Sequence, residues 1–301
     1  MGSAPGTVRL ATHAMGTRFE CVLLGEDAGF LRAAGEETLA IIEDQHRRLN
    51  RFERGGPVWE VNALAGVGGV RVDDELFELL VRCEAYQAAS GGAFAVARRV
   101  SPGGVEAGGD ASLLRLDSHA RSVSLVHAGT MLDLGGIAKG FALDLAGEAL
   151  RRAGVRAGLV HGGGSTIVAI GAPPGERGWG VELGGTGWRG TRPIARLRDR
   201  AVSVSSQSGD RPGHVIDPAT GSAGRGRWAA CIGESAEATD AWSTALIVLG
   251  GRTSCVPPGL TVVQHRDDLP TLARPGLGPV GPDWVASGPD AGLIECSGAC
   301  D

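Results

Sequence analysis

The sequence contains no run of roughly eighteen apolar residues, which is the length that a membrane-spanning helix requires. Its first residues also lack a charged region followed by an apolar one, the pattern of a secretory signal. A dense stripe of Lys and Arg with interleaved aromatic residues is missing as well, and the formal net charge is -5. We therefore expect a cytoplasmic protein with no membrane span and no nucleic-acid partner.

Paired cysteines are absent too. The six cysteines form no CxxC motif and are scattered along the chain, at Cys21, Cys83, Cys231, Cys255, Cys296 and Cys300. In a reducing compartment such residues are expected to remain free thiols. Cys296 and Cys300 form a CxxxC, for which a frayed tail is the expectation and a metal or redox role is the alternative.

Glycine, in contrast, is abundant: 50 of the 301 residues, without a collagen-like period and spread among apolar segments. Helical and strand patterns mix without regular alternation, which favours an α+β fold. Helices are expected at 30–50, 72–90, 138–153 and 234–249. Strands are expected within 16–25, 157–171, 179–184, 200–207, 260–265 and 290–296. A surface loop is expected at 101–111.

The segment LDLGGIAKGFALD, residues 132–144, places two glycines, a lysine and a third glycine where an apolar run becomes a helix. A helix N-terminus carries free N–H groups and the positive end of the macrodipole. Lys139 beside it therefore predicts an anion site, with phosphate as the favoured ligand. The spacing differs from the Walker motif, which disfavours a P-loop ATPase. The alternative is a tight strand-to-helix turn with a solvated lysine.

Asp240 and Thr244 stand one turn apart on one face of the helix expected at 234–249, among apolar residues. A carboxylate and a hydroxyl are hard oxygen ligands that suit Mg²⁺, whose shell phosphate and water complete. In the alternative, the helix dipole stabilises Asp240 and Thr244 bonds back to a helix carbonyl.

The segment HVIDPATG combines a histidine with turn residues around Asp217. The imidazole of His214 is a candidate proton-transfer group, with a structural histidine as the alternative. The triple glycine of HGGG can offer main-chain N–H groups to a phosphate or a carbonyl, or mark only a bulge. A Ser-His-Asp triad through Ser205 or Ser206 lacks the G-x-S-x-G elbow and is disfavoured.

The chain resembles the ApbE family of flavin transferases over residues 13–251, in the segments HAMGTRFE, LNRFERGG, SGGAF, LDLGGIAKGFALD, HGGG, AVSVSSQSGD, HVIDPATG and ATDAWSTALIVLG. Members are FAD:protein FMN transferases, and some act as Mg²⁺-dependent FAD pyrophosphatases. The resemblance implies a two-lobed, T-fold-like α+β architecture in one domain over 1–301, with 252–301 as a C-terminal extension that closes the fold. FAD would lie between the lobes with Mg²⁺ on its pyrophosphate. FMN would pass to a Thr or Ser hydroxyl of an acceptor protein, and AMP would leave.

Carried onto this chain, the resemblance makes Asp240 and Thr244 side-chain ligands of Mg²⁺. Gly136 would be a further ligand through its backbone carbonyl. Lys139 would lie near the phosphates of FAD, His214 would be the general base that activates the acceptor hydroxyl, and Asp217 would sit beside the reacting phosphate. The remaining substrate contacts implied for FAD are Met15, Gly16, Thr17, Gly163, Ser205 and Ser206.

Three departures from the family pattern predict altered substrate contacts. Ala95 follows Phe94 where the family usually has Asp, His161 stands where an Asn is common, and the loop between Ser206 and His214 is short. Two other functions are kept as alternatives: an FAD pyrophosphatase giving FMN and AMP, and a noncatalytic flavin-binding or scaffold protein. An acceptor motif of the D-x-x-[ST]-G-A-[ST] type is missing, so self-flavinylation is not expected. A homodimer is left open.

Overall fold

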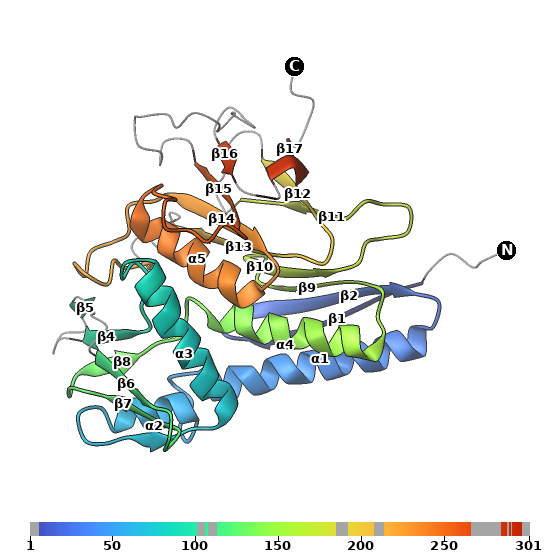
Figure 1. Ribbon diagram of the computed structural model, residues 1–301. Helices are drawn as coiled ribbons and strands as arrows, with labels where there is room; N and C mark the ends of the chain where they lie inside the picture. Colours follow the sequence, from blue (N-terminus) through green and yellow to red (C-terminus); the bar gives the residue numbers. More distant parts are fainter. Residues whose placement is uncertain are drawn as a thin grey trace.

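The largest element of the structure is an antiparallel sheet with the strand order β1-β2-β9-β10-β13-β14-β15-β16 (Figure 1). This computed structural model describes residues 6–100, 106–107, 113–184, 192–207, 214–265, 284–287, 289 and 291–296. The strands of the sheet are Gly6–Ala14 (β1), Thr17–Gly25 (β2), Ala157–Gly162 (β9), Thr166–Ile170 (β10), Ala201–Ser206 (β13), Trp228–Gly233 (β14), Thr261–His265 (β15) and Trp284–Ser287 (β16). Pairing of β2 with β9 and of β10 with β13 makes neighbours of segments that are far apart in the chain.

Three helices lie along one face of this sheet: α1 (Ala28–Leu49), α4 (Ala138–Ala153) and α5 (Ala236–Leu249). The side chains of Asp27 and Ser235 cap α1 and α5 by accepting hydrogen bonds from backbone N–H groups of the first turns. The core between α1, α4 and the sheet is apolar and includes Phe19, Leu23, Ile42, Leu143, Leu150 and Val160.

The opposite face of the large sheet packs against a smaller sheet of β11 (Trp179–Glu182), β12 (Pro193–Leu197) and β17 (Ile294–Cys296). A short helix at Ala291–Leu293 directly precedes β17. Alternate residues of the strands supply this second core, because successive side chains of a strand point to opposite faces. Its buried members include Ile167, Ala169, Val181, Ala195, Leu197, Val202 and Ile232. We call the two sheets with α1, α4 and α5 the large lobe.

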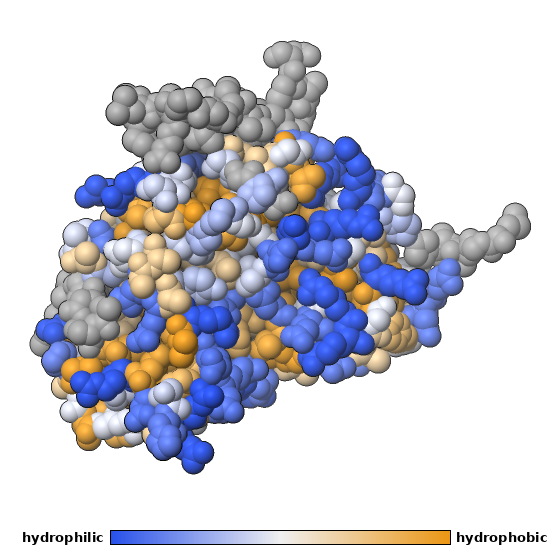
Figure 2. Space-filling model, in the orientation of Figure 1, coloured by the Kyte–Doolittle hydropathy of each residue, from blue (hydrophilic) through white to orange (hydrophobic). Residues whose placement is uncertain are grey.

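The remaining described elements form the small lobe, at the lower left of Figure 1. It contains α2 (Pro57–Ala63) and α3 (Asp74–Ala89). Two three-stranded sheets complete it, made of β3 (Val70–Arg71), β7 (Ser122–Leu125) and β6 (Leu114–Asp117), and of β5 (Glu106–Ala107), β4 (Ala97–Val100) and β8 (Thr130–Leu132). Figure 2 shows apolar residues reaching the surface of this lobe, where Phe52, Leu64, Val67 and Val81 are exposed.

An ion pair between the half-buried Arg82 and the buried Glu237 joins the lobes where α3 meets α5. Nε and Nη2 of Arg82 donate to the carboxylate of Glu237 at 2.7 and 2.8 Å, and the hydroxyl of Tyr86 lies 3.2 Å from Oε1 of the same carboxylate. The hydrogen bond to Glu237 raises the pKa of Arg82, and burial together with Glu237 raises the pKa of Tyr86. The pair fixes the small lobe against the N-terminal turn of α5.

Helices α4 and α5 touch backbone to backbone at Gly140. A Cβ on Gly140 would lie 2.6 Å from the carbonyl carbon of Ala236, so only glycine permits this approach. One turn further along α4, the carboxylate of Asp144 accepts the N–H groups of Ala236 and Glu237 and the hydroxyl of Ser235, at 2.7 to 2.9 Å. Burial nevertheless raises the pKa of Asp144, against the lowering effect of these hydrogen bonds.

The α+β fold and the four expected helices are confirmed, and Gly154 ends α4 in the left-handed conformation. The prediction missed α2, the small-lobe strands β3, β4, β6 and β7, and the large-lobe strands β1, β12, β14 and β16. It also missed β5 within the loop expected at 101–111, of which only 106–107 is described. Cys21, Cys83, Cys231 and Cys255 are free thiols as expected. The frayed tail is wrong for Cys296, which ends β17, whereas Cys300 lies outside the described residues. Within the described ranges, no helix is both long and apolar enough to cross a membrane.

Candidate active site

A cavity of about 600 Å³ opens between the two lobes. The small lobe contributes the segment from Ala93 to Val96 and Arg98 on β4. The large lobe contributes the start of α4, the end of β13, one face of α5 and the chain around His214. Of the residues predicted for the site, the cavity brings together Gly136, Lys139, Gly163, Ser205, Ser206, His214, Asp240 and Thr244.

The segment before α4 forms the floor of the cavity. Oδ1 of Asp133 accepts a hydrogen bond from the N–H of Gly135 at 2.9 Å. Oδ2 accepts a hydrogen bond from Nη2 of Arg98 and lies 3.6 Å from Nε of Arg51. No side chain caps α4 at Ile137, but two of its first N–H groups have partners: that of Ala138 donates to the backbone oxygen of Leu134 at 2.8 Å, and that of Gly140 donates to Oδ2 of Asp240 at 3.1 Å. The expected helix start after the two glycines is therefore confirmed, and it lies at the cavity.

Lys139, the only lysine of the chain, meets the carboxylate of Asp240 at the cavity wall. Its Nζ lies 3.6 Å from Oδ2 of Asp240, which also accepts the N–H of Gly140 at 3.1 Å. Oδ1 of Asp240 accepts the hydroxyl of Ser203 at 2.9 Å and lies 3.4 Å from that of Thr166. The carboxylate is thus buried but paired, as a buried charge must be.

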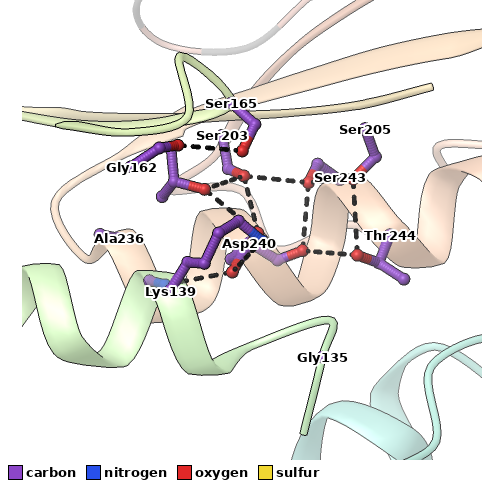
Figure 3. A network of polar contacts seen from close by, with 12 residues as sticks. Gly135, Lys139, Gly162, Ser165, Ser203, Ser205, Ala236, Asp240, Ser243 and Thr244 are labelled. Carbon is purple, nitrogen blue, oxygen red and sulfur yellow. Dashed lines mark hydrogen bonds and ion pairs between the residues drawn. The ribbon is translucent and has the colours of Figure 1, made fainter. Parts of the chain in front are cut away.

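Hydroxyl groups of β13 and α5 face one another beside Asp240 (Figure 3). Oγ1 of Thr244 donates to the backbone oxygen of Asp240 at 3.0 Å, which is the local bond expected in the alternative interpretation of this residue. Oγ of Ser205 lies 2.9 Å from that of Ser243 and 3.5 Å from that of Thr244. The oxygen of Thr244 can still accept, because only its proton is used.

These oxygen atoms fit a hard cation. The backbone of Gly136 lies against Thr244, since a Cβ on Gly136 would be 3.3 Å from Oγ1 of Thr244. One carboxylate, hydroxyl oxygens and a main-chain carbonyl are the ligand types that Mg²⁺ uses together with phosphate and water. Among the described residues, no three or more His, Cys, Asp and Glu side chains gather closely enough to hold a metal ion by themselves. A cation here would depend on neutral oxygen atoms.

The glycine loop between β9 and β10 borders the cavity through Gly163. Gly163 has a φ of +60°, and a Cβ on it would lie 3.2 Å from Cβ of Thr17, so the loop and the β1–β2 turn touch. Met15 and Gly16 form that turn, and the N–H of Met15 donates to Nδ1 of His46 at 3.1 Å. In the described structure none of Met15, Gly16 and Thr17 is among the residues that line the cavity, and Thr17 adjoins it through Gly163.

The chain around His214 places its two predicted residues differently. His214 is exposed and lines the cavity together with Val215, Ile216 and Pro218. Asp217 lines a neighbouring hollow instead, and its Oδ1 accepts the N–H of Ala219 at 2.9 Å. The turn expected at Asp217 is therefore present, and the carboxylate of Asp217 stabilises it by accepting this backbone hydrogen bond.

Sequence reasoning missed five side chains of this region: Arg98, Asp133, Ser165, Ser203 and Ser243. A signal existed for one of them, because Ser203 and Ser205 alternate along β13 and so share a face. Arg98 gave no comparable signal, since its place at the cavity depends on the pairing of β4 with β8 next to Asp133.

Together the fold and this cavity define a two-lobed α+β protein with a polar, hydroxyl-rich site at the junction of its lobes. A family model described as the ApbE family matches residues 15–102 and 104–265. The chain therefore belongs to the ApbE family.

Two curated relatives carry the name FAD:protein FMN transferase. The protein of Treponema pallidum is 29% identical over 296 residues, which cover 83% of this chain and 82% of that protein. The protein of Rhodobacter capsulatus is 28% identical over 264 residues, which cover 77% of this chain and 50% of that protein. This chain therefore matches half the length of the second relative.

Solved structures share the fold. The apo flavinyl transferase ApbE of Pseudomonas stutzeri superposes with a TM-score of 0.75 at 21% identity, covering 99% of both chains. The flavin transferase ApbE of Vibrio cholerae has a TM-score of 0.72 at 19% identity, covering 87% of this chain and 94% of that one. Both likenesses confirm the two-lobed architecture expected from the sequence.

Proposed function

We propose that this protein transfers FMN from FAD to a Thr or Ser hydroxyl of an acceptor protein and releases AMP, in a reaction that depends on Mg²⁺. One observation carries the proposal: the cavity of this ApbE-family chain combines Lys139, His214 and the Asp240 and Thr244 pair. The names of the two relatives support FAD as the donor and a protein as the acceptor.

The side chains divide the work of binding and proton transfer. Lys139, at the positive end of the α4 dipole, would hold the pyrophosphate, because a helix N-terminus and a cation together favour an anion. His214, exposed at the opening of the cavity, would accept the proton of the acceptor hydroxyl. The hydroxyl oxygen would then bond to the phosphorus of the FMN half, and the bridging oxygen would leave with AMP.

Asp240, Thr244 and the carbonyl of Gly136 would hold Mg²⁺, whose charge would neutralise the pyrophosphate as the bond breaks. Asp240 is suited to this role because Ser203 and Gly140 fix its orientation from behind. The pair with Lys139 is a contact of 3.6 Å, longer than a direct hydrogen bond, so a cation could share the carboxylate.

The experiment incubates the purified protein with FAD, with Mg²⁺ or EDTA, with and without an acceptor carrying a D-x-x-[ST]-G-A-[ST] segment. Chromatography measures AMP and free FMN, and mass spectrometry measures FMN on the acceptor. We expect AMP and acceptor-bound FMN in equal amounts, and only with Mg²⁺. Free FMN with AMP would identify a pyrophosphatase, and intact FAD in every sample would contradict the proposal.

The variant Asp240→Ala tests whether Asp240 is a ligand of Mg²⁺. We expect it to abolish Mg²⁺-dependent AMP release while the circular dichroism of the fold is kept. Glu148→Ala is a useful comparison, because Glu148 is a 61% exposed carboxylate on α4 and does not line the cavity. Unchanged turnover in Asp240→Ala would remove Asp240 from the metal site.

A further inference from the structure

A chain of hydroxyl groups runs from the carboxylate of Asp240 to the cavity (Figure 3). Ser203 lies 2.9 Å from Oδ1 of Asp240, Ser243 lies 3.4 Å from Ser203, and Ser205 lies 2.9 Å from Ser243. Ser203 and Ser243 are fully buried, whereas Ser205 is half-buried and lines the cavity. The chain therefore ends on a hydroxyl that a ligand can reach.

The neighbours of each hydroxyl decide where its single proton goes. A carboxylate and a carbonyl only accept, so Ser203 donates to Asp240 and Thr244 donates to the backbone oxygen of Asp240 at 3.0 Å. Ser243 is the donor in two contacts, to the same backbone oxygen at 3.1 Å and to the hydroxyl of Ser203 at 3.4 Å, and its single proton serves these. The contact between Ser243 and Ser205 must then use the proton of Ser205.

With its proton turned toward Ser243, Ser205 presents lone pairs to the cavity. Thr244 does the same, because its proton is directed at the backbone of its own helix. The two oxygen atoms are 3.5 Å apart, and that of Thr244 lies beside the backbone of Gly136. Two hydroxyl oxygens that can only accept favour a cation over a hydrogen-bond acceptor such as phosphate.

We propose that Ser205 is a further ligand of the cation assigned to Asp240, Thr244 and Gly136. Ser243 is then a positioning residue, which holds the proton of Ser205 away from the cation. This inference rests on the metal dependence in the proposed function. Asp240 is the one carboxylate among the assigned ligands, so neutral oxygen atoms such as that of Ser205 must complete the shell of the cation.

The test measures binding of Mn²⁺ to the nucleotide-free protein by electron paramagnetic resonance, so that turnover plays no part in the readout. Mn²⁺ accepts the same oxygen ligands as Mg²⁺. We expect Ser205→Ala and Ser243→Ala each to weaken Mn²⁺ binding roughly 10-fold or more, the loss typical for a metal site deprived of a supporting group. Ser205→Thr keeps the hydroxyl and should keep the affinity, as should Ser206→Ala.

The double variant Ser205→Ala and Ser243→Ala separates positioning from a general loss of structure. If Ser243 acts through Ser205, the double variant binds Mn²⁺ as Ser205→Ala does, because coupled residues are not additive. Losses that multiply would overturn the role of Ser243. Unchanged binding in Ser205→Ala, or no Mn²⁺ binding by the unmodified protein, would overturn the ligand assignment.

Acceptor-bound FMN, measured separately, keeps the two proposals apart. If the protein transfers FMN but Ser205→Ala binds Mn²⁺ with unchanged affinity, the inference is overturned and the proposed function is supported. Mn²⁺ binding that depends on Ser205, in a protein that never transfers FMN, would do the reverse.

Discussion

Replacing Gly140 by Ala tests the contact that sets the distance between α4 and α5. The added Cβ would lie 2.6 Å from the carbonyl carbon of Ala236 and 2.8 Å from Cβ of Asp240, and closer still to the carbonyl oxygen of Ala236. Carbon atoms ordinarily keep about 3.5 Å apart, so the helices must separate by on the order of 1 Å. The obstacle is backbone, which cannot rotate aside as a side chain can.

Two effects of opposite sign set the magnitude. Overpacking of a close contact costs about 1–3 kcal/mol, and a backbone obstacle places Gly140→Ala at the upper end. Alanine regains about 1 kcal/mol of helix propensity over glycine. We therefore expect a net loss of about 2 kcal/mol in the free energy of unfolding. Because the N–H of Gly140 donates to Asp240, Mn²⁺ binding should weaken as well.

Urea unfolding followed by circular dichroism measures the first effect. Gly29→Ala is the matched control: Gly29 is exposed in the first turn of α1, and its added Cβ would lie 3.3 Å from the side chain of Asp27. This variant should be neutral or slightly stabilising. The reasoning is refuted if Gly140→Ala is as stable as the unmodified protein, or loses no more than Gly29→Ala.

Three further predictions concern charge. Arg82→Met should cost about 2 kcal/mol, less than the 3–5 kcal/mol of a fully buried pair because Arg82 is 42% exposed, and Arg82→Met with Glu237→Met should restore most of it in urea unfolding. Equal stability of the two variants would contradict this. Burial raises the pKa of Asp144 above its usual 3.8, so the stability it contributes is complete below that pH and is lost as pH rises through the raised value. The advantage of the unmodified protein over Asp144→Asn should accordingly shrink as the pH rises above about 4, and an advantage that grows would refute the assignment. His214→Ala should lower the rate of FMN transfer, measured by AMP release, about 100-fold or more. It should change the affinity for FAD, measured by flavin fluorescence, only little. Equal losses of rate and of affinity would make His214 a structural histidine.

The long helices could be predicted because they depend on local sequence patterns. The four long helices show apolar spacing and clear ends, such as Gly154 after α4. Strand β1 was missed because GTVRLATHA alternates exposed and buried residues only weakly, and its assignment depends on pairing with β2. Helix α2 has seven residues, too few for a periodic signal.

Some residues of the site could be predicted from the sequence, and others could not. Lys139 and the Asp240 and Thr244 pair could be found from the sequence, because a helix start and a spacing of four residues fix which side chains share a place. The position of Asp217 could not, since a turn residue can point to either side of its loop. The structure directs its carboxylate to the N–H of Ala219, and it lines the hollow next to the cavity.

The sequence by itself determined the family, the helices and the residue types that gather at the start of α4 and on α5. Only the tertiary structure decided what those residues touch. Gly140 serves the approach of a second helix, and Ser203 and Ser205 of β13 meet Asp240 and Ser243 from a strand about 40 residues away. The physical reason is that a hydrogen bond or a close contact depends on which distant backbone comes alongside, and sequence spacing carries no record of that pairing.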